Sequence, residues 1–448
     1  MLKIQLCLLA LLLGLAIAEE TRKSYKGYKV YLLTLETQAQ LDFLNRMNDD
    51  LLTKDLAGEV ELWTERNQLT KALPQTVNMM VSPREDKEFL RLINGQTIQH
   101  KVEIPDLSVL LEEESYISPS DQRVISEGGM TWTAYHRYST IERFLETLAT
   151  NYSAIVEKST LGKSYEGRNL YLMKIGKPRA DGKTKPAVWM DAQIHAREWI
   201  ACATVTYMMN KLVTEYGLNE TVTRMVDQID WYVLPVINVD GYEFTHTNER
   251  LNRLTRQINP FSSRIGADPN RNYDHKWMLQ GATQQAGTEI YAGPFPFSEP
   301  ENLHLTEAVL QRRNQIKTLL TFHSAVQMWL LPWGYDLIYP DDYQDLMQMG
   351  VRATDALTAV YGTRYAVGSS TELLGAAAGA TDDWGKAKAG VKYSVTVELR
   401  NPRGFGAPST ASSFILPPEQ IIPSGLETFE AIRVVGEIVY QEFGPTLN

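Results

Sequence analysis

The sequence predicts an α/β domain with a mixed central sheet flanked by helices, preceded by a small α+β open sandwich. Two observations lead to this prediction. Apolar runs of strand length are separated by helical stretches in the C-terminal part of the chain, and short elements in βαββαβ order come before them. The 448 residues leave room for two or three domains of about 100 to 200 residues each.

Residues 19–123 show short strands and helices in alternation. Their order is typical of an open-faced sandwich. The expected strands are 29–35, 60–64, 77–81 and 100–104, and the expected helices are 37–47 and 86–95. An acidic stretch from Glu112 to Ser120 then lacks periodicity and runs up to Arg123, which predicts a linker exposed to trypsin-like cleavage.

The N-terminus carries a separate signal. Lys3 precedes an apolar run from Leu6 to Ile17, and Ala18 is followed by two glutamates. A positive start, a short apolar run and a small residue at its exit are typical of a secretory signal peptide, here residues 1–18. Because a membrane span needs about 20 apolar residues, we expect no membrane anchor and a secreted, extracellular protein.

Charge and cysteine content argue against two further features. The net charge is −10 and no basic stripe stands out, so we expect no nucleic-acid partner. Of the two cysteines, Cys7 lies in the predicted signal peptide, which leaves Cys202 alone in the mature chain. An intramolecular disulfide is therefore excluded.

Residues 124–448 open with a helix that a capping box predicts. Ser139 is placed as the N-cap with Glu142 three residues later, and an apolar face follows at helical spacing. Apolar runs of strand length lie at 187–190, 232–237, 319–322 and 393–397, and helical stretches lie at 203–216 and 426–440. Strands that are apolar on both faces and separated by helices predict a largely buried mixed sheet.

Polar residues follow three of these strands, at the edge where open α/β sheets collect ligands. His195 and Glu198 follow the first strand, His323 follows the third and Glu398 follows the fourth. Catalytic zinc takes three protein ligands and keeps one position for water. We therefore expect one Zn²⁺ held by the two histidines and Glu198, with Glu398 as the base that accepts a proton from water. Taken singly, the HxxE pair also fits a surface helix and His323 a core histidine.

Arginines gather in the loop after the strand at 232–237, and Asn270 lies beside the last of them. These arginines are Arg250, Arg253, Arg256, Arg264 and Arg271. Composition alone fits a solvated basic loop. The functional alternative is recognition of an anion, because arginine presents a planar fork to carboxylates. Zinc, a base and such arginines together suggest hydrolysis next to a free carboxylate, as at the C-terminus of a peptide.

Over most of its length the chain resembles the secreted zinc carboxypeptidases of the pancreatic A/B type, which are made as zymogens. The matching strings are GKSYEGR from Gly162, HAREW from His195, DPNRNYD from Asp268, FSEPE from Phe297, HS from His323 and ELR from Glu398. The resemblance implies a hydrolase that removes the C-terminal residue of peptides and proteins. It also implies that residues 19–123 are an inhibitory propeptide, removed by a trypsin-like protease near Arg123, and that residues 124–448 are the catalytic domain.

The resemblance implies the zinc ligands and the base named above, and it adds four roles. Arg253 would polarise the scissile carbonyl and stabilise the oxyanion. Asn270 and Arg271 would hold the terminal carboxylate of the substrate. Arg197 would bind the substrate further from the scissile bond.

Some positions depart from the family pattern. The mobile substrate-capping tyrosine falls on Gly375, the tyrosine after the zinc-binding His-Ser pair is Ala325, and the glycine two residues before the first zinc histidine is Gln193. Residues 401–413 form a longer segment than usual, and the disulfide cysteines of the family are missing. These changes keep open an alternative function, a catalytically impaired homologue that binds peptides or carboxylates.

Asp382 falls on the family position at the base of the specificity pocket, where an acidic residue accompanies a C-terminal Lys or Arg. Ser370, nearby in the same alignment, is polar as well. Because a buried carboxylate pairs with an incoming cation, we expect a B-like preference for a basic C-terminal residue. If Asp382 turns into the interior network instead, an A-like apolar or aromatic preference follows.

Overall fold

The structure, a computed structural model, describes residues 22–53, 58–63, 73–401 and 411–445. The predicted signal peptide and most of the long segment 401–413 lie outside these residues. Within the part of the chain that the structure describes, no helix is both long and apolar enough to cross a membrane.

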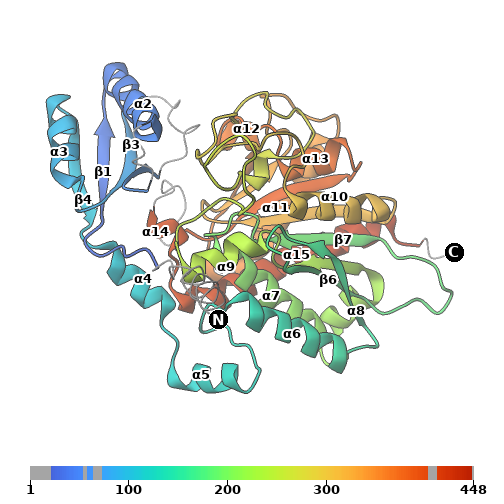
Figure 1. Cartoon of the computed structure of the whole chain (residues 1–448). Coiled ribbons are helices and arrows are strands. Elements are labelled where there is room, and N and C mark those ends of the chain that lie inside the picture. Colours follow the sequence, from blue (N-terminus) through green and yellow to red (C-terminus); the bar gives the residue numbers. More distant parts are fainter. Residues whose placement is uncertain (1–21, 54–57, 64–72, 402–410, 446–448) are drawn as a thin grey trace, which may run out of the picture.

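The N-terminal part is the predicted open sandwich, with helices beside a four-stranded antiparallel sheet of order β2-β3-β1-β4 (Figure 1). Its elements are β1 (Lys29–Leu35), α2 (Gln38–Thr53), β2 (Val60–Leu62), β3 (Gln75–Val81), α3 (Asp86–Gly95) and β4 (Gln99–Ile104). Leu33 of β1, Leu44 of α2 and Phe89 of α3 share one core. The βαββαβ prediction is therefore confirmed.

The acidic stretch after the sandwich is largely helical, which its lack of periodicity did not predict. It forms α4 (Leu107–Ser115) and α5 (Pro119–Ser126). Asp106 caps α4 and Ser118 caps α5, each by accepting a backbone N–H. Periodicity was hard to detect because α4 is short and buries only a few side chains, while no side chain of α5 is buried. Arg123 lies exposed on α5.

The C-terminal part is built on an eight-stranded mixed sheet of order β11-β10-β12-β9-β7-β8-β6-β5. The strands are β5 (Val156–Lys163), β6 (Asn169–Ile175), β7 (Ala187–Ala192), β8 (Asp230–Leu234), β9 (Ile316–His323), β10 (Met328–Leu331), β11 (Ala366–Ser369) and β12 (Tyr393–Glu398). The central strands β12, β9, β7 and β8 are parallel neighbours. Every residue of β7, β8 and β12 is buried, as expected for strands covered on both faces.

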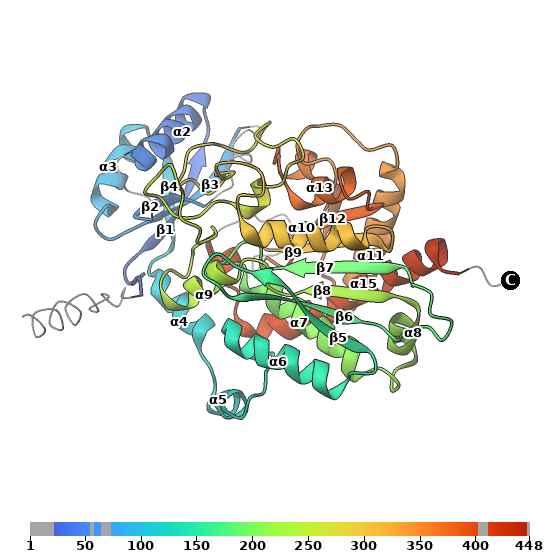
Figure 2. The same ribbon diagram turned by 45° about the vertical axis from the view of Figure 1, so that its right-hand side comes forward.

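Helices cover both faces of this sheet, with α10 and α13 on one side and α6 and α7 on the other (Figure 2). Helices α7 (Trp199–Thr214) and α15 (Ile421–Phe443) pack against β7 and β9, and α13 (Thr381–Ala387) packs against β9 and β12. The others are α6 (Tyr138–Asn151), α8 (Glu220–Gln228), α9 (Val239–Thr247), α10 (Pro300–Arg312), α11 (Tyr343–Tyr361), α12 (Ser370–Leu373), α14 (Ala411–Phe414) and the 3₁₀ turns η2 (Pro269–Arg271) and η3 (Pro418–Gln420). The predicted α/β fold with a mixed central sheet is confirmed.

Helix α6 begins earlier than predicted. Its N-cap is Arg137, which makes no side-chain capping bond, so the prediction of Ser139 as N-cap is wrong. The predicted apolar face is nevertheless buried, with Ile141 and Leu145 in the core. Packing of that face stabilises the helix more than a capping box does, and this explains why the helix extends past Ser139.

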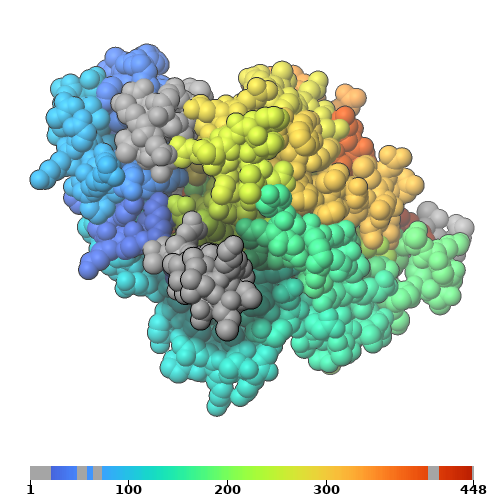
Figure 3. Space-filling view, in the orientation of Figure 1, coloured from blue at the N-terminus to red at the C-terminus, as the bar shows by residue number. Residues whose placement is uncertain are grey.

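The N-terminal part lies along one side of the C-terminal part (Figure 3). One apolar cluster spans the two, with Leu111 of α4 packed in the same cluster as Leu251 and Ile415. Strand β2 reaches the cavity described below. The sandwich therefore covers a region next to the carboxyl ends of the central strands.

Candidate metal centre and substrate cleft

His195, Glu198 and His323 converge at one edge of the sheet. His195 and Glu198 lie in the turn between β7 and α7, and His323 ends β9, the parallel neighbour of β7. One ligand atom of each residue lies within 4.8 Å of the others, and all three residues are buried. Nδ1 of His195 lies 2.8 Å from Oε1 of Glu198 and 3.1 Å from Nδ1 of His323. Two imidazole nitrogens and a carboxylate at this spacing fit the ligand set of a catalytic zinc.

The electrostatics of this group favour metal-binding protonation states. Burial opposes a charge on Glu198, but the imidazoles of His195 and His323 hold the pKa of its carboxyl well below its usual range. Burial also lowers the pKa of His323, so that its imidazole is neutral near pH 7. An ionised carboxylate and a neutral imidazole are the forms that coordinate a metal.

Asp268 is a functional residue that the sequence reasoning missed. It is fully buried, and its Oδ1 lies 3.2 Å from Nε2 of His195 while its Oδ2 accepts from Nη2 of Arg253 at 2.9 Å. Burial opposes its ionisation, but Arg253 and Arg271 hold the pKa of its carboxyl well below the usual range. Such a partner on the second ring nitrogen fixes the orientation of a metal-binding histidine. The signal in the sequence was that Asp268 opens the string containing Asn270 and Arg271.

Glu398 lies beside the metal group. It is the last residue of β12, and in the parallel register with β9 it lies opposite His323. Register partners on neighbouring strands place their side chains on the same face of the sheet. Glu398 is 9% exposed, so the structure brings a largely buried carboxylate to the position expected of the base.

A cavity of about 990 Å³ lies next to this group. Four of the five arginines predicted to form a cluster line this cavity. Arg253, Arg256, Arg264 and Arg271 line the cavity, whereas Arg250 does not. Nη1 of Arg253 lies 3.9 Å from Oε1 of Glu198, which connects the cavity to the metal group.

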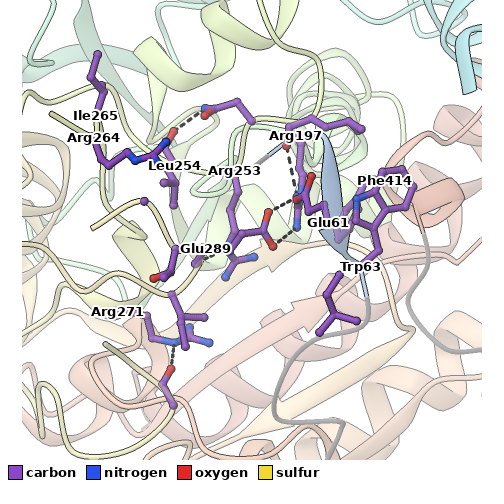
Figure 4. Close-up of a pocket in the computed structure, with 18 of the residues that line it drawn as sticks. Glu61, Trp63, Arg197, Arg253, Leu254, Arg264, Ile265, Arg271, Glu289 and Phe414 are labelled. Carbon is purple, nitrogen blue, oxygen red and sulfur yellow. Dashed lines mark hydrogen bonds and ion pairs between the residues drawn. The ribbon is translucent and has the colours of Figure 1, made fainter. Parts of the chain in front are cut away.

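Arg197 lies where the N-terminal part meets the cavity (Figure 4). Its guanidinium donates to both carboxylate oxygens of Glu289, at 2.5 and 3.0 Å, and lies 3.5 Å from Oε1 of Glu61 on β2. Burial and the neighbouring Glu289 raise the pKa of Glu61. The N-terminal part thus places a carboxyl group on the arginine that was predicted to bind substrate.

Asn270 and Arg271 lie together in η2. Arg271 donates through Nε to the carbonyl of Gly281 at 2.8 Å, and its Nη1 lies 3.9 Å from Oδ2 of Asp268. Oδ1 of Asn270 accepts from the N–H and hydroxyl of Thr381 at 2.9 and 3.0 Å, which turns the Nδ2 donor away from Thr381. The structure therefore brings both predicted carboxylate-binding residues close to the metal group.

Asp382 lies in the interior, and it is not among the described residues that line the cavity. Its side chain is 2% exposed, and Oδ1 accepts from the N–H of Asp383 at 3.0 Å. Burial raises the pKa of Asp382 to about 6. Asp383 in turn binds the backbone N–H groups of Gly334 and Tyr335, so this acidic pair supports the loop beside the cavity.

Three of the unusual positions can be placed. Gly375 lines the cavity with a φ of 98°, in the left-handed region that favours glycine. Ala325 is buried. Gln193 has a φ of 61°, and its Nε2 donates to the carbonyls of His195 and Ala196 at 3.2 and 2.7 Å.

Comparison with known proteins identifies the family. The family described as "Zinc carboxypeptidase" matches residues 141–431, and the one described as "Carboxypeptidase activation peptide" matches residues 31–114. The chain belongs to the zinc carboxypeptidase family, and it carries that family's activation peptide. It is a metallocarboxypeptidase, which confirms the resemblance and the enzyme class predicted above.

Several relatives align with this chain over most of their own length. Carboxypeptidase B of Astacus astacus is 46% identical over 311 residues, covering 69% of this chain and 98% of that protein. Carboxypeptidase B of Rattus norvegicus is 33% identical over 433 residues, covering 96% of this chain and 98% of that protein. Among solved structures, thrombin activatable fibrinolysis inhibitor aligns with a TM-score of 0.82 at 27% identity, covering 93% of this chain and all of that chain. Carboxypeptidase A from Helicoverpa armigera aligns with a TM-score of 0.77 at 25% identity. The alignment covers 93% of this chain and 98% of that chain.

Proposed function

We propose that this protein is a secreted zinc exopeptidase, made as a precursor, that removes the last residue from peptides and proteins. One observation carries the proposal. Asp268 lies 3.2 Å from His195 of the metal group and 3.9 Å from Arg271, the predicted carboxylate-binding residue. The two groups are thus separated by a single side chain. A cleft that binds the free carboxylate this close to the metal group favours cleavage of the terminal peptide bond.

His195, Glu198 and His323 hold one Zn²⁺ in this proposal. A bound zinc supplies a Lewis acid that polarises a carbonyl and increases the acidity of water. Glu398, at the same edge of the sheet, accepts a proton from the attacking water and passes it to the leaving amine. Its position opposite His323 in the strand register supports this role.

The arginines of the cleft have separate roles in this proposal. Arg253, held by Asp268, presents its guanidinium to the negative charge that develops on the scissile carbonyl oxygen. Arg271 and Asn270 bind the terminal carboxylate of the substrate. Arg197 binds the substrate further upstream, once Glu61 of the propeptide has left its guanidinium.

We further propose a preference for a basic C-terminal residue, with Asp382 as the group that recognises it. The support is the family position of Asp382 and its burial, because a cationic side chain brought next to a buried carboxylate would favour the ionised form. The competing preference is for an apolar or aromatic residue. It follows if the Asp382 carboxyl only accepts hydrogen bonds inside the protein, as from the N–H of Asp383, and does not contact the substrate.

The boundaries of the mature enzyme belong to the same proposal. A signal peptide of residues 1–18 is removed on secretion, a propeptide of residues 19–123 is removed by a trypsin-like protease, and residues 124–448 remain as the enzyme. The exposure of Arg123 on α5, a helix with no buried side chain, supports cleavage at this position.

The test combines zinc content with hydrolysis of matched peptides ending in Lys, Arg, Phe, Leu or Glu after trypsin treatment of the precursor. We expect about one zinc per chain and release of the last residue only. Glu398→Gln should lower kcat by about 10² to 10⁴ and leave zinc content unchanged. Zinc without release from any peptide would instead support the alternative, a peptide-binding homologue impaired at Gly375 and Ala325.

A further inference from the structure

His323 faces the metal group with one ring nitrogen and the protein interior with the other. Its Nδ1 lies 3.1 Å from Nδ1 of His195 and 3.4 Å from Oε2 of Glu198. Its Nε2 lies 3.4 Å from the hydroxyl oxygen of Thr321, the only hydrogen-bond partner of this nitrogen among the residues that the structure describes. Because His323 is only 1% exposed, Nε2 depends on a partner inside the protein.

The chemistry of the ring decides which atom donates in this contact. A neutral imidazole carries one N–H, and a nitrogen that coordinates a metal cannot keep its proton. Because Nδ1 of His323 faces the metal group, Nε2 carries the proton and donates it to Oγ1 of Thr321. The hydroxyl of Thr321 has a single hydrogen of its own, and this hydrogen needs a second acceptor.

Asp191 on β7 is placed to be that acceptor. It is the partner of Thr321 in the parallel register of β7 and β9, and register partners place their side chains on the same face of the sheet. His323 follows Thr321 by two residues on β9, so its side chain lies on this face as well. The sheet therefore aligns a carboxylate, a hydroxyl and a metal-binding imidazole on one face.

Asp191 is a fully buried carboxylate that can accept a further hydrogen bond. Its Oδ2 accepts from Nε1 of Trp189 at 2.7 Å, whereas its Oδ1 has no donor at ordinary geometry within the described part of the chain. Burial raises the pKa of Asp191 to about 7, and the hydroxyl of Thr321 opposes this rise by favouring the ionised form. Because an unpaired buried carboxylate oxygen is costly, the hydrogen of Thr321 is stabilising at Oδ1.

We propose that Asp191 is a positioning residue for the metal group, and that it acts on His323 through the hydroxyl of Thr321. This inference rests on the proposed function, which places zinc on His323. The imidazole donates to Thr321, and Thr321 donates to Asp191. These two bonds hold the ring in the tautomer that leaves Nδ1 free, and they fix its orientation. His195 obtains the same support directly from Asp268, so each metal-binding histidine has a carboxylate of its own.

Substitutions of Thr321 separate this role from packing. Thr321→Val keeps the shape of the side chain and loses the hydroxyl, whereas Thr321→Ser keeps the hydroxyl. The matched control is Thr318→Val, because Thr318 is buried on the same strand and its hydroxyl has no hydrogen-bond partner within the described ranges. In the full precursor, competition with a chelator should show a zinc affinity about 10- to 100-fold lower in Thr321→Val. Thr321→Ser and Thr318→Val should bind zinc as the wild type does.

A double-mutant cycle tests whether Asp191 acts through Thr321. Asp191→Asn should weaken zinc binding in the wild type and cause little further loss in a protein that already carries Thr321→Val. Equal zinc affinity in Thr321→Val and Thr318→Val would overturn the proposal, and so would an undiminished effect of Asp191→Asn beside Thr321→Val.

Zinc affinity does not depend on catalysis, so the two proposals can fail separately. A wild type that binds zinc but hydrolyses no peptide would count against the proposed function alone. A wild type that binds no zinc would overturn both.

Discussion

At the scale of single residues, one buried carboxylate links two functional groups. Asp268 contacts His195 of the metal group through Oδ1 and Arg253, the proposed oxyanion-stabilising residue, through Oδ2. Both partners stabilise its ionised form, and this compensates for its burial. Asp268 therefore determines the orientation of His195 and of Arg253 together, although we do not expect it to touch the substrate.

Replacing this carboxylate should weaken zinc binding. We expect Asp268→Asn to lower zinc affinity by about 10- to 100-fold, because His195 loses the acceptor that orients its ring. Competition with a chelator measures the affinity directly. Asp274→Asn is the matched control, since Asp274 belongs to the same string but is exposed and pairs only loosely with Lys388, at 3.4 Å. Equal zinc affinity in the two variants would contradict the role assigned to Asp268.

The specificity proposed for Asp382 predicts a pH dependence. Its pKa of about 6 means that the carboxyl is neutral below this pH and charged above it. Attraction to a basic residue should therefore appear as the pH rises. We expect the ratio of kcat/KM for peptides ending in Arg and in Leu to increase through pH 6, since effects on the shared chemistry cancel in the ratio.

Asp382→Asn should keep this ratio low and independent of pH. The control is Asp341→Asn, an exposed aspartate in the segment before α11. If Asp382→Asn leaves the ratio and its pH profile as in the wild type, Asp382 serves only the interior network. The preference would then have to come from the residues that line the cavity.

At the scale of elements, the turn from β7 to α7 presents His195 and Glu198. Gln193 enters this turn with a φ of 61°, a conformation that costs a non-glycine residue about 1 kcal/mol or more. Its side chain offsets this cost by binding the carbonyls of His195 and Ala196. The turn is therefore held by a side chain, where the family pattern has glycine.

Two substitutions separate the strain from the hydrogen bonds. Gln193→Ala keeps the strained backbone and loses both bonds, so we expect the free energy of unfolding to fall by about 1 to 3 kcal/mol. Gln193→Gly also loses the bonds but removes the strain, so it should be the more stable of the two. Chemical denaturation with zinc removed measures both, with the exposed Gln284→Ala as control. The opposite order of stability would show that the backbone at this position is not strained.

At the scale of the whole molecule, the precursor combines a covered cleft with an exposed helix at the proposed cleavage site. The propeptide is held by α4 and by β2, whereas α5 buries no side chain. A helix with so little packing unfolds locally at small cost, which a protease requires before it can cut. Helix α5, which carries Arg123, should therefore open more easily than α4, which buries Leu107, Leu111 and Glu114.

Arg123→Gln should block activation by trypsin. We expect the variant to remain a latent precursor under conditions that activate the wild type fully, because trypsin requires a basic residue at the cut. Activity and the new N-terminus of the large fragment report the outcome. Arg143→Gln serves as control, since Arg143 is exposed on α6. Normal activation of Arg123→Gln, with a new N-terminus elsewhere, would move the boundary of the propeptide.

The order of strands and helices could be predicted because it follows from local patterns. The run at 187–190 is apolar on both faces, and it forms the buried strand β7. The run at 393–397 has Ser394 and Thr396 on one face, and it forms the equally buried β12. Ser139 shows where such reasoning fails, since its capping pattern was overridden by the packing of α6. The acidic stretch is a second case, because the partner that makes α4 a helix lies far away in the sequence.

The sequence by itself determined the fold class, the candidate metal ligands and the predicted base, because their residue types and their places after apolar strands are local features. Only the tertiary structure showed that Asp268 joins the metal group to Arg271, that Glu114 meets Arg250, and that Asp382 is buried and is not among the described residues that line the cavity. The physical reason is the same in each case. These contacts join side chains that other elements bring together, and the free energy of burying a charge depends on the partner that the fold supplies.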